Sequence, residues 1–216
     1  MRKKKFSNQL KSYLIKLKKS FLYESLLLLI LGSLSSFSLP PFNYFLINFL
    51  TFSILLIILF NKLKKKNSKK IYFYYGWLFG FGYFISNLYW ISISLTFDET
   101  FKFLIPIALI LIPLFLSLFV GFTTLLIGPY LQFNFLSLII FSGGIAFSDY
   151  LRSKILTGFP WNLWAYSTTW FNEILQILNL IGLFPYNLLV ITIFTVPAIF
   201  FFKIKTVKKI LSTFFA

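Results

Sequence analysis

The sequence predicts an all-α fold, a polytopic membrane helix bundle of about six transmembrane helices with a cytoplasmic amino terminus. Three observations lead to this prediction. Of the 216 residues, 58% are hydrophobic and 12% are charged, about half the charged fraction usual in soluble domains. Several apolar runs are long enough to cross a bilayer. The 21 Lys and Arg residues collect mainly in the segments between those runs.

The amino-terminal third alternates basic segments with two apolar spans. Residues 1–20 form a basic arm, which fits either an interfacial helix on an anionic leaflet or a solvated tail. Spans are expected over 21–37 and 44–60. The segment Leu-Pro-Pro-Phe-Asn at 39–43 predicts a stop and a tight reversal between them, because proline does not continue a helix. A lysine-rich turn at 61–70 follows.

The third span, expected over 71–95, carries residues suited to helix packing and to the membrane surface. Gly76 and Gly80 form a pair of small residues one turn apart, a spacing that lets a neighbouring helix approach closely. Tyr89 and Trp90 lie towards the far end of the span. Such aromatic pairs more often anchor a helix at the interface than contact a ligand, and both interpretations stay open here.

The fourth span is expected over 103–127 and the fifth over 136–151, with a Gly-Pro turn between them. Pro106 and Pro113 both fall within the fourth span. Proline inside a membrane helix frees a carbonyl group, so a kink stabilised by contacts within the bundle is expected there.

Asp149 and Arg152 end the fifth span three residues apart. That spacing puts both side chains on one helix face, where they can form an ion pair. Arg152 is also a candidate for contact with a phosphate headgroup. The spacing favours the structural pair, because it supplies a partner for Arg152 without any ligand.

The segment 152–180 contains a long aromatic loop that is nearly uncharged. Its proline predicts a break in helical structure. One explanation is an interfacial belt of aromatic rings; the other is a loop shaped to hold lipid or substrate at the membrane surface. Under the second explanation the candidate lining residues are Tyr89, Trp90, Phe159, Pro160, Trp161, Trp164 and Tyr166.

The carboxyl-terminal part predicts an amphipathic interfacial segment over 171–180 and a sixth span over 181–202. These elements complete a membrane domain over 21–202. The tail, residues 203–216, begins with lysines and ends in a short apolar stretch. That stretch fits the start of an incomplete seventh span, or a short segment lying on the membrane surface.

The distribution of basic residues sets the expected orientation. With the amino terminus inside, the arm, the 61–70 turn and the tail hold eight, six and four Lys or Arg residues, 18 of the 21 in the chain. The aromatic loop then lies on the non-cytoplasmic side. Because the basic residues sit between spans rather than on one folded face, we expect no nucleic-acid partner.

The residue types present exclude several kinds of chemistry within this sequence. It contains no Cys and no His, which removes disulfides, thiol nucleophiles, imidazole bases and the usual zinc ligands. Only five carboxylates occur in the whole sequence, too few to favour a carboxylate metal site. We therefore predict no metal, no cofactor and no catalytic residue in this chain.

Several motifs resemble the amino-terminal membrane region of the apolipoprotein N-acyltransferase family. They are the Leu-Pro-Pro-Phe-Asn segment at 39–43, the glycine-rich segment 76–82 that leads to Tyr-Trp-Ile-Ser-Ile-Ser at 89–94, and Asp-Tyr-Leu-Arg at 149–152. The last of these runs into Thr-Gly-Phe-Pro-Trp and then Tyr-Ser, within 157–167. The order and spacing of these motifs carry the resemblance, which covers most of the chain.

The resemblance implies a function in the bacterial cytoplasmic (inner) membrane. Members of this family transfer an acyl chain from phospholipid to the amino-terminal Cys of lipoproteins. They continue into a nitrilase-like domain that carries a Glu-Lys-Cys catalytic set. This chain departs from the family in having no Cys, in having Asp149 where Glu is usual, and in having Ala165 where Gly is usual.

The sequence thus predicts the membrane half of such an acyltransferase, inactive by itself. Its expected partners are phospholipid, a lipoprotein substrate and a nitrilase-like catalytic half, if that half is encoded separately. The alternative is a noncatalytic membrane scaffold, or a vestigial fragment that binds lipid or a partner. A small transporter fits less well, because the spans show no internal repeat and few ionisable residues.

Overall fold

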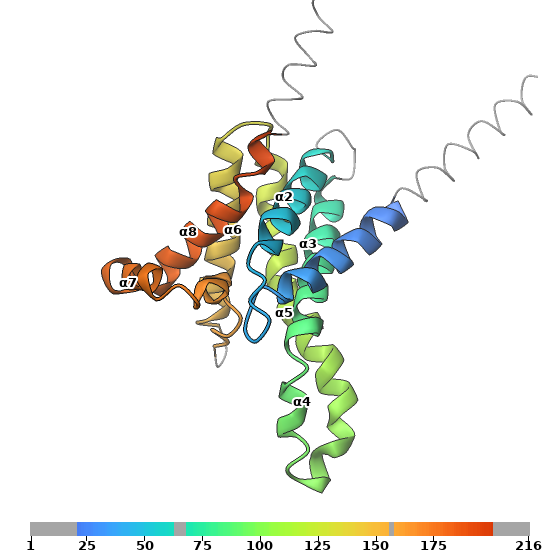
Figure 1. Cartoon of the computed structure of the whole chain (residues 1–216). Coiled ribbons are helices and arrows are strands. Elements are labelled where there is room, and N and C mark those ends of the chain that lie inside the picture. The colour runs from blue at the N-terminus through green and yellow to red at the C-terminus, as the bar shows by residue number, and fades with distance from the viewer. Residues whose placement is uncertain (1–20, 63–67, 156–157, 201–216) are drawn as a thin grey trace, which may run out of the picture.

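The computed structural model describes residues 21–62, 68–155 and 158–200. Within these residues every regular element is a helix and no strand occurs, in agreement with the predicted all-α class (Figure 1). The basic arm over 1–20 and the tail over 203–216 lie outside the described residues. So do residues 63–67 of the lysine-rich turn.

The helices follow the predicted spans in order, with differences at their ends. Helix Phe21–Ser36 comes first, and the described α-helices after it are α2 (Ile47–Phe60), α3 (Ser68–Asn87), α4 (Ile91–Ser94), α5 (Ile105–Ile127), α6 (Leu136–Arg152), α7 (Asn172–Ile181) and α8 (Leu183–Thr195). Short 3₁₀ helices lie before α5, after it and in the aromatic loop: η1 (Glu99–Leu104), η2 (Gly128–Tyr130) and η3 (Trp164–Thr168).

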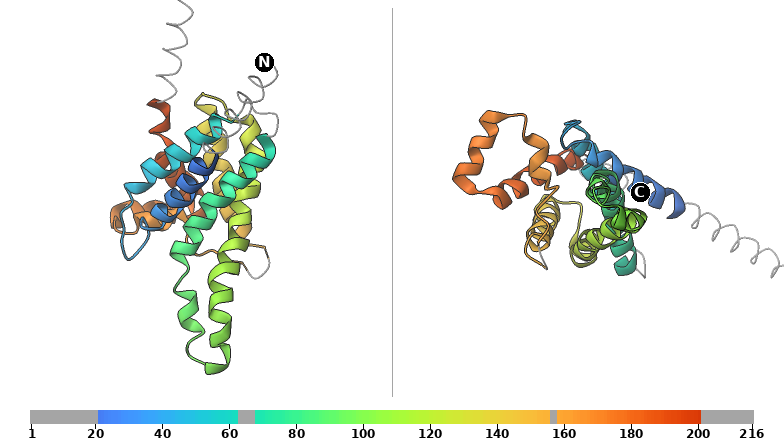
Figure 2. Two further views of the ribbon diagram at one scale, coloured as in Figure 1. Left: turned by 90° about the vertical axis from the view of Figure 1, so that its right-hand side faces the viewer. Right: turned by 90° about the horizontal axis from the view of Figure 1, so that it is seen from below.

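Helices α3 and α5 pack along each other as an antiparallel pair, with α4 and η1 at the far end of the hairpin (Figures 1 and 2). Helix α6 packs against both α5 and α8, and α8 also packs against α2. The amphipathic α7 lies at the edge of the bundle on the side away from the hairpin (Figure 2). Where the aromatic loop leaves α6, it turns back against α8 and the end of α3.

Two predicted spans are interrupted in the structure. The span expected over 71–95 ends as a helix at Asn87, and only the short α4 follows. The span expected over 181–202 breaks after Thr195. Pro197 explains the second break, because it has no N–H with which to continue the hydrogen-bond pattern of α8.

The two prolines of the expected fourth span have different positions in α5. Pro106 lies in the first turn of α5, where a helix needs no N–H donor, so it interrupts no hydrogen bond of the helix. Pro113 does lie inside α5 and is buried there.

Several glycines mark where helices approach most closely. A methyl group on Gly82 of α3 would lie 2.1 Å from the carbonyl oxygen of Leu29, and one on Gly32 would lie 2.0 Å from that of Phe79. These two glycines therefore let the backbones of helix Phe21–Ser36 and α3 cross in contact. Gly76 and Gly80, the pair expected from their spacing, face α5: Gly76 lies against the side chain of Thr124, and Gly80 against Val120 and Ser117.

A second link between these helices is ionic. Lys62, just after α2, pairs with Glu24 of helix Phe21–Ser36, and the Tyr75 hydroxyl of α3 donates to the same carboxylate. The Lys62 side chain is only 6% exposed. The contact joins three helices at one end of the bundle. Its polar groups satisfy one another where water is scarce.

One described helical segment, Glu99–Tyr130, is both long and apolar enough to cross a membrane. Helix Phe21–Ser36, α2 and α8 are apolar but shorter than that criterion requires. The predicted count of six spans and the predicted orientation therefore stay predictions.

Candidate functional site

Three segments that are far apart in the sequence meet around one open cavity of about 550 Å³. They are the proline-rich reversal after the first helix, the end of α3 with the turn after it, and the aromatic loop. The lining residues are Ser36, Leu39, Pro40, Pro41, Phe42, Ser86, Asn87, Tyr89, Trp90, Trp161, Asn162, Tyr166 and Thr169. The three motif regions singled out in the sequence thus each contribute to this cavity.

Large aromatic rings stand at the cavity with much of their surface uncovered. Tyr89, Trp90 and Trp161 are 54%, 43% and 57% exposed. The rings of Trp90 and Trp161 meet edge to face, with their centroids 6.4 Å apart. Since one ring comes from the α3–α4 turn and the other from the aromatic loop, this contact joins the two segments.

The lining contains no charged side chain. Its polar groups are the hydroxyls and amides of Ser, Thr, Tyr and Asn residues. Burial raises the pKa of Tyr166, against a smaller lowering by the positive charge of Arg152, so the phenol is neutral near pH 7. An uncharged wall of aromatic rings with a few hydrogen-bonding groups suits an apolar ligand with a polar end.

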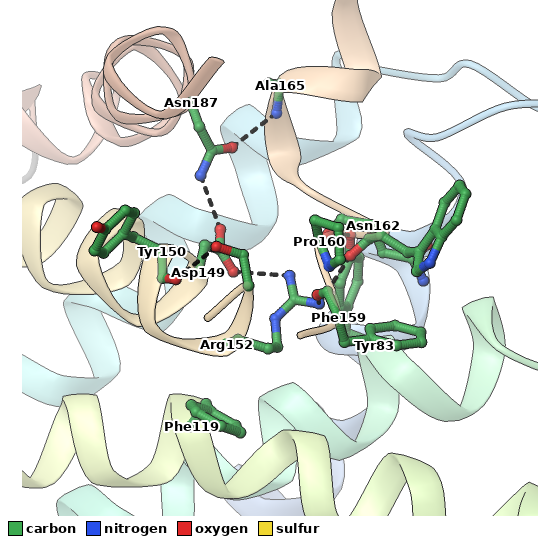
Figure 3. A network of polar contacts seen from close by, with 12 residues as sticks. Tyr83, Phe119, Asp149, Tyr150, Arg152, Phe159, Pro160, Asn162, Ala165 and Asn187 are labelled. Atoms are coloured by element: carbon green, nitrogen blue, oxygen red, sulfur yellow. Dashed lines mark hydrogen bonds and ion pairs between the residues drawn. The ribbon is translucent and has the colours of Figure 1, made fainter. Parts of the chain in front are cut away.

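Arg152, at the end of α6, is not among the cavity-lining residues, and its guanidinium points toward the loop at Phe159 (Figure 3). Its Nη1 donates to the carbonyl oxygens of Phe159 and Trp161, at 2.9 and 2.8 Å. Its Nη2 donates to Asp149 Oδ1 at 3.1 Å. The guanidinium also lies 5.2 Å from the ring centre of Phe84. With 2% of its surface exposed, Arg152 contacts protein groups that already satisfy it.

Asn187 of α8 belongs to the same network, and the sequence analysis did not find it. The residue is fully buried. Its Nδ2 donates to Asp149 Oδ2 at 2.9 Å, and its Oδ1 accepts from the backbone N–H of Ala165 at 2.9 Å (Figure 3). The only sequence signal was a polar residue in an apolar span, which is weak unless its partner is known.

The aromatic residues of the loop divide into two groups. Trp161 and Tyr166 line the cavity, whereas Phe159, Pro160 and Trp164 are not among the lining residues. Trp164 is 4% exposed and packs 4.0 Å from Tyr83 and 4.7 Å from Phe52, measured between ring centroids. Its position is that of a core residue.

The backbone of the loop takes two left-handed conformations. Gly158 has φ 73° and Asn162 has φ 61°. Glycine adopts this region without strain, and asparagine tolerates it better than most residues. The Tyr83 hydroxyl donates to the carbonyl oxygen of Asn162 at 2.9 Å, which fastens the second of these turns to α3.

Within the described residues, no cluster of three or more His, Cys, Asp or Glu side chains is suited to a metal ion. The cavity therefore offers hydrophobic contact and neutral hydrogen bonds as its means of holding a ligand.

Comparison with known proteins connects this chain to one family. A family model described as the apolipoprotein N-acyltransferase N-terminal domain matches residues 31–196. The chain is 34% identical over 173 residues to an apolipoprotein N-acyltransferase of Rhodopseudomonas palustris, an alignment that covers 79% of this chain and 32% of that protein.

Two further relatives carry the same name. The relative from Rhizobium etli is 32% identical over 182 residues, covering 82% of this chain and 34% of that protein. The relative from Brucella melitensis is 30% identical over 178 residues, covering 78% and 33%. The chain thus spans about a third of the length of the curated relatives it matches.

Proposed function

Because the chain belongs to the apolipoprotein N-acyltransferase family, in which it matches the amino-terminal domain, we propose that it is the membrane part of such an enzyme. In this role it binds the phospholipid acyl donor, and the acyl chain goes to the amino-terminal Cys of a lipoprotein. It lies in the bacterial inner membrane with about six spans and with the aromatic loop outside the cytoplasm.

The observation that carries the proposal is the meeting of three family motifs at one cavity. Aromatic rings line this cavity, and no charged group does. Such a wall accepts the apolar chains of a lipid, while the Tyr and Asn groups can bond its ester region. The buried Arg152 is a structural residue in this proposal, not a headgroup ligand, because three protein oxygens already accept its hydrogen bonds.

The acyl-transfer nucleophile lies outside this sequence in our proposal. The sequence has no Cys, and the relatives are about three times as long as the part that aligns. A nitrilase-like catalytic part therefore has to join this membrane part, either in one polypeptide or as a separate chain. Without it, we expect no acyltransferase turnover.

A chimera tests the proposal. This chain replaces the corresponding third of the Rhodopseudomonas palustris relative, and the product is expressed in a bacterium depleted of its own apolipoprotein N-acyltransferase. We expect the amino-terminal peptide of a resident lipoprotein to gain one acyl chain, as measured by mass spectrometry. The remaining two thirds of the relative, expressed without this chain, is the control.

A chimera that accumulates in the membrane in folded form but leaves the lipoprotein unacylated would contradict the proposal. The noncatalytic scaffold would then be the better explanation. It predicts that the chain binds lipid or a partner protein but never supports acyl transfer.

A further inference from the structure

A network of buried polar side chains connects α8 to the aromatic loop. None of these side chains lines the cavity. Asn187 is held between two partners, the Asp149 carboxylate and the Ala165 N–H. Asp149 also accepts a hydrogen bond from Arg152, whose guanidinium donates to the carbonyl groups of Phe159 and Trp161. Two helices thereby hold three backbone groups of one loop.

Loss of any one side chain should destabilise this polar network. Asp149, Arg152 and Asn187 are all buried, at 7%, 2% and 0% exposure. Removing one partner from a buried charged network leaves the others without compensation, which costs far more than the loss of a surface hydrogen bond. Each link therefore depends on the next.

Between Gly158 and Leu163 the loop has no regular secondary structure, so individual hydrogen bonds fix its backbone. Besides the bonds from Arg152, the Tyr83 hydroxyl donates to the Asn162 carbonyl and the Phe159 N–H to the Arg152 carbonyl. The two ends of the stretch are held by bonds from the Gly158 N–H to the Ile155 carbonyl and from the Tyr166 N–H to the Leu163 carbonyl, and the Tyr166 hydroxyl donates to the Pro160 carbonyl at 3.4 Å. Asn162 also holds a left-handed conformation. A change at Asn187 therefore reaches Trp161 through two intermediate side chains.

We propose that Asn187 is a positioning residue, which acts with the Asp149–Arg152 pair to fix the aromatic loop and so to hold Trp161 and Tyr166 at the cavity. The effect of Asn187 on lipid capture rests on the proposed function, whereas its effect on the conformation of the loop does not. Asn187 is not among the residues that line the cavity. It sets the shape of the wall that meets the acyl donor.

Hydrogen exchange on this chain by itself tests the structural part. In the variant Asn187→Ala the Ala165 N–H loses its acceptor, so we expect peptides over 158–166 to exchange at least about tenfold faster, equivalent to the loss of a ~1.4 kcal/mol hydrogen bond. Peptides from α3 and α5 should exchange as before.

The matched control is Thr192→Ala. Thr192 also lies on α8 and donates to Ser142 of α6 at 2.9 Å, so it links the same two helices without contacting the loop. Exchange over 158–166 should be unchanged in this variant. Equal protection of the loop in Asn187→Ala and the unaltered chain would overturn the proposal. So would equal deprotection by the control.

A charge swap gives a rescue that simple loss of stability cannot mimic. Asn187→Asp alone sets two carboxylates against each other, and the loop should lose protection. In the double variant Asp149→Asn with Asn187→Asp, the new amide can donate to the new carboxylate, which can still accept from Ala165 N–H. We expect protection to return in the double variant, and its failure to return would count against the network.

Kinetics of the chimera test the consequence for lipid capture. Asn187→Ala should raise KM for the phospholipid donor about tenfold with little change in kcat, because the wall that receives the donor is displaced while the catalytic part is intact. A fall in kcat at constant KM would instead indicate fewer folded molecules. An inactive chimera would refute the proposed function and leave the exchange test standing.

Discussion

At positions 32 and 82 the chain has no room for a side chain, because each glycine faces the backbone of the neighbouring helix. A facing side chain can rotate away from a new methyl group, whereas a facing carbonyl belongs to a helix that must shift as a whole. Sequence spacing pointed to Gly76 and Gly80 as the packing pair. It could not identify the Gly32–Gly82 crossing, where backbone faces backbone, because the two residues lie on different helices.

Gly82→Ala should therefore destabilise the bundle by about 1–3 kcal/mol, the usual cost of overpacking a closed contact. Gly143→Ala is the matched control, since a methyl group there meets no atom within 4 Å. Alanine in the α6 interior should stabilise the chain by about 0.5–1 kcal/mol. Denaturant unfolding of the detergent-solubilised chain measures both, and a neutral Gly82→Ala would contradict the crossing.

Two tryptophans of the aromatic loop should respond to mutation in opposite ways. Trp164 is buried among aromatic rings, so Trp164→Ala should cost about 3–5 kcal/mol of stability. Trp161 is 57% exposed at the cavity, so Trp161→Ala should change stability by no more than about 0.5 kcal/mol.

In the chimera, Trp161→Ala should raise KM for the donor about 30-fold, which corresponds to the ~2 kcal/mol typical of a central tryptophan contact. Thermal unfolding and donor kinetics, measured on the same variants, separate the two roles. If Trp161→Ala unfolds the chain or leaves the kinetics unchanged, the division of the loop into core and cavity residues is wrong.

At the scale of the elements, hydrophobic runs predicted where helices lie better than where they end. The fifth span was expected over 136–151, and α6 covers Leu136–Arg152. The segment expected over 171–180 as amphipathic is α7, Asn172–Ile181. Both agree because the apolar pattern and the local turn residues point to the same boundaries.

Helix ends went unpredicted where apolar composition continues past a break. Leu88 and Ile91 are as apolar as the helix before them, yet α3 ends at Asn87 and the chain turns there. A hydropathy pattern cannot predict this turn, because the turn changes the direction of the backbone but not the polarity of the side chains. The same turn brings Tyr89 and Trp90 to the cavity.

The Asp149–Arg152 contact was predictable from spacing on one helix, whereas Asn187 was not. Its two partners lie 22 and 38 residues earlier in the chain, on the loop and on α6. Local sequence patterns report contacts within an element. Contacts between elements depend on how the helices pack, and this is why the site could be predicted only in part.

At the scale of the whole molecule, the orientation in the membrane is the main prediction. The sequence contains no Cys, so single cysteines can be introduced without background. In Lys102→Cys, a membrane-impermeant maleimide added to intact spheroplasts should label the protein, because this half-exposed residue lies in η1, the connection between α4 and α5. Lys66→Cys should react only after the membrane is opened, and the reverse pattern would refute the orientation.

The assembly of the cavity also fixes an order of events during synthesis. Its walls come from residues as far apart in the sequence as Ser36 and Thr169. The aromatic loop, which forms one wall, is hydrogen-bonded to Asn187 of α8 through the Ala165 N–H. A nascent chain is made from its amino terminus, so the first two walls exist long before the third. The cavity can therefore reach its final form only after the ribosome has passed α8, and until then two of its walls exist without the third.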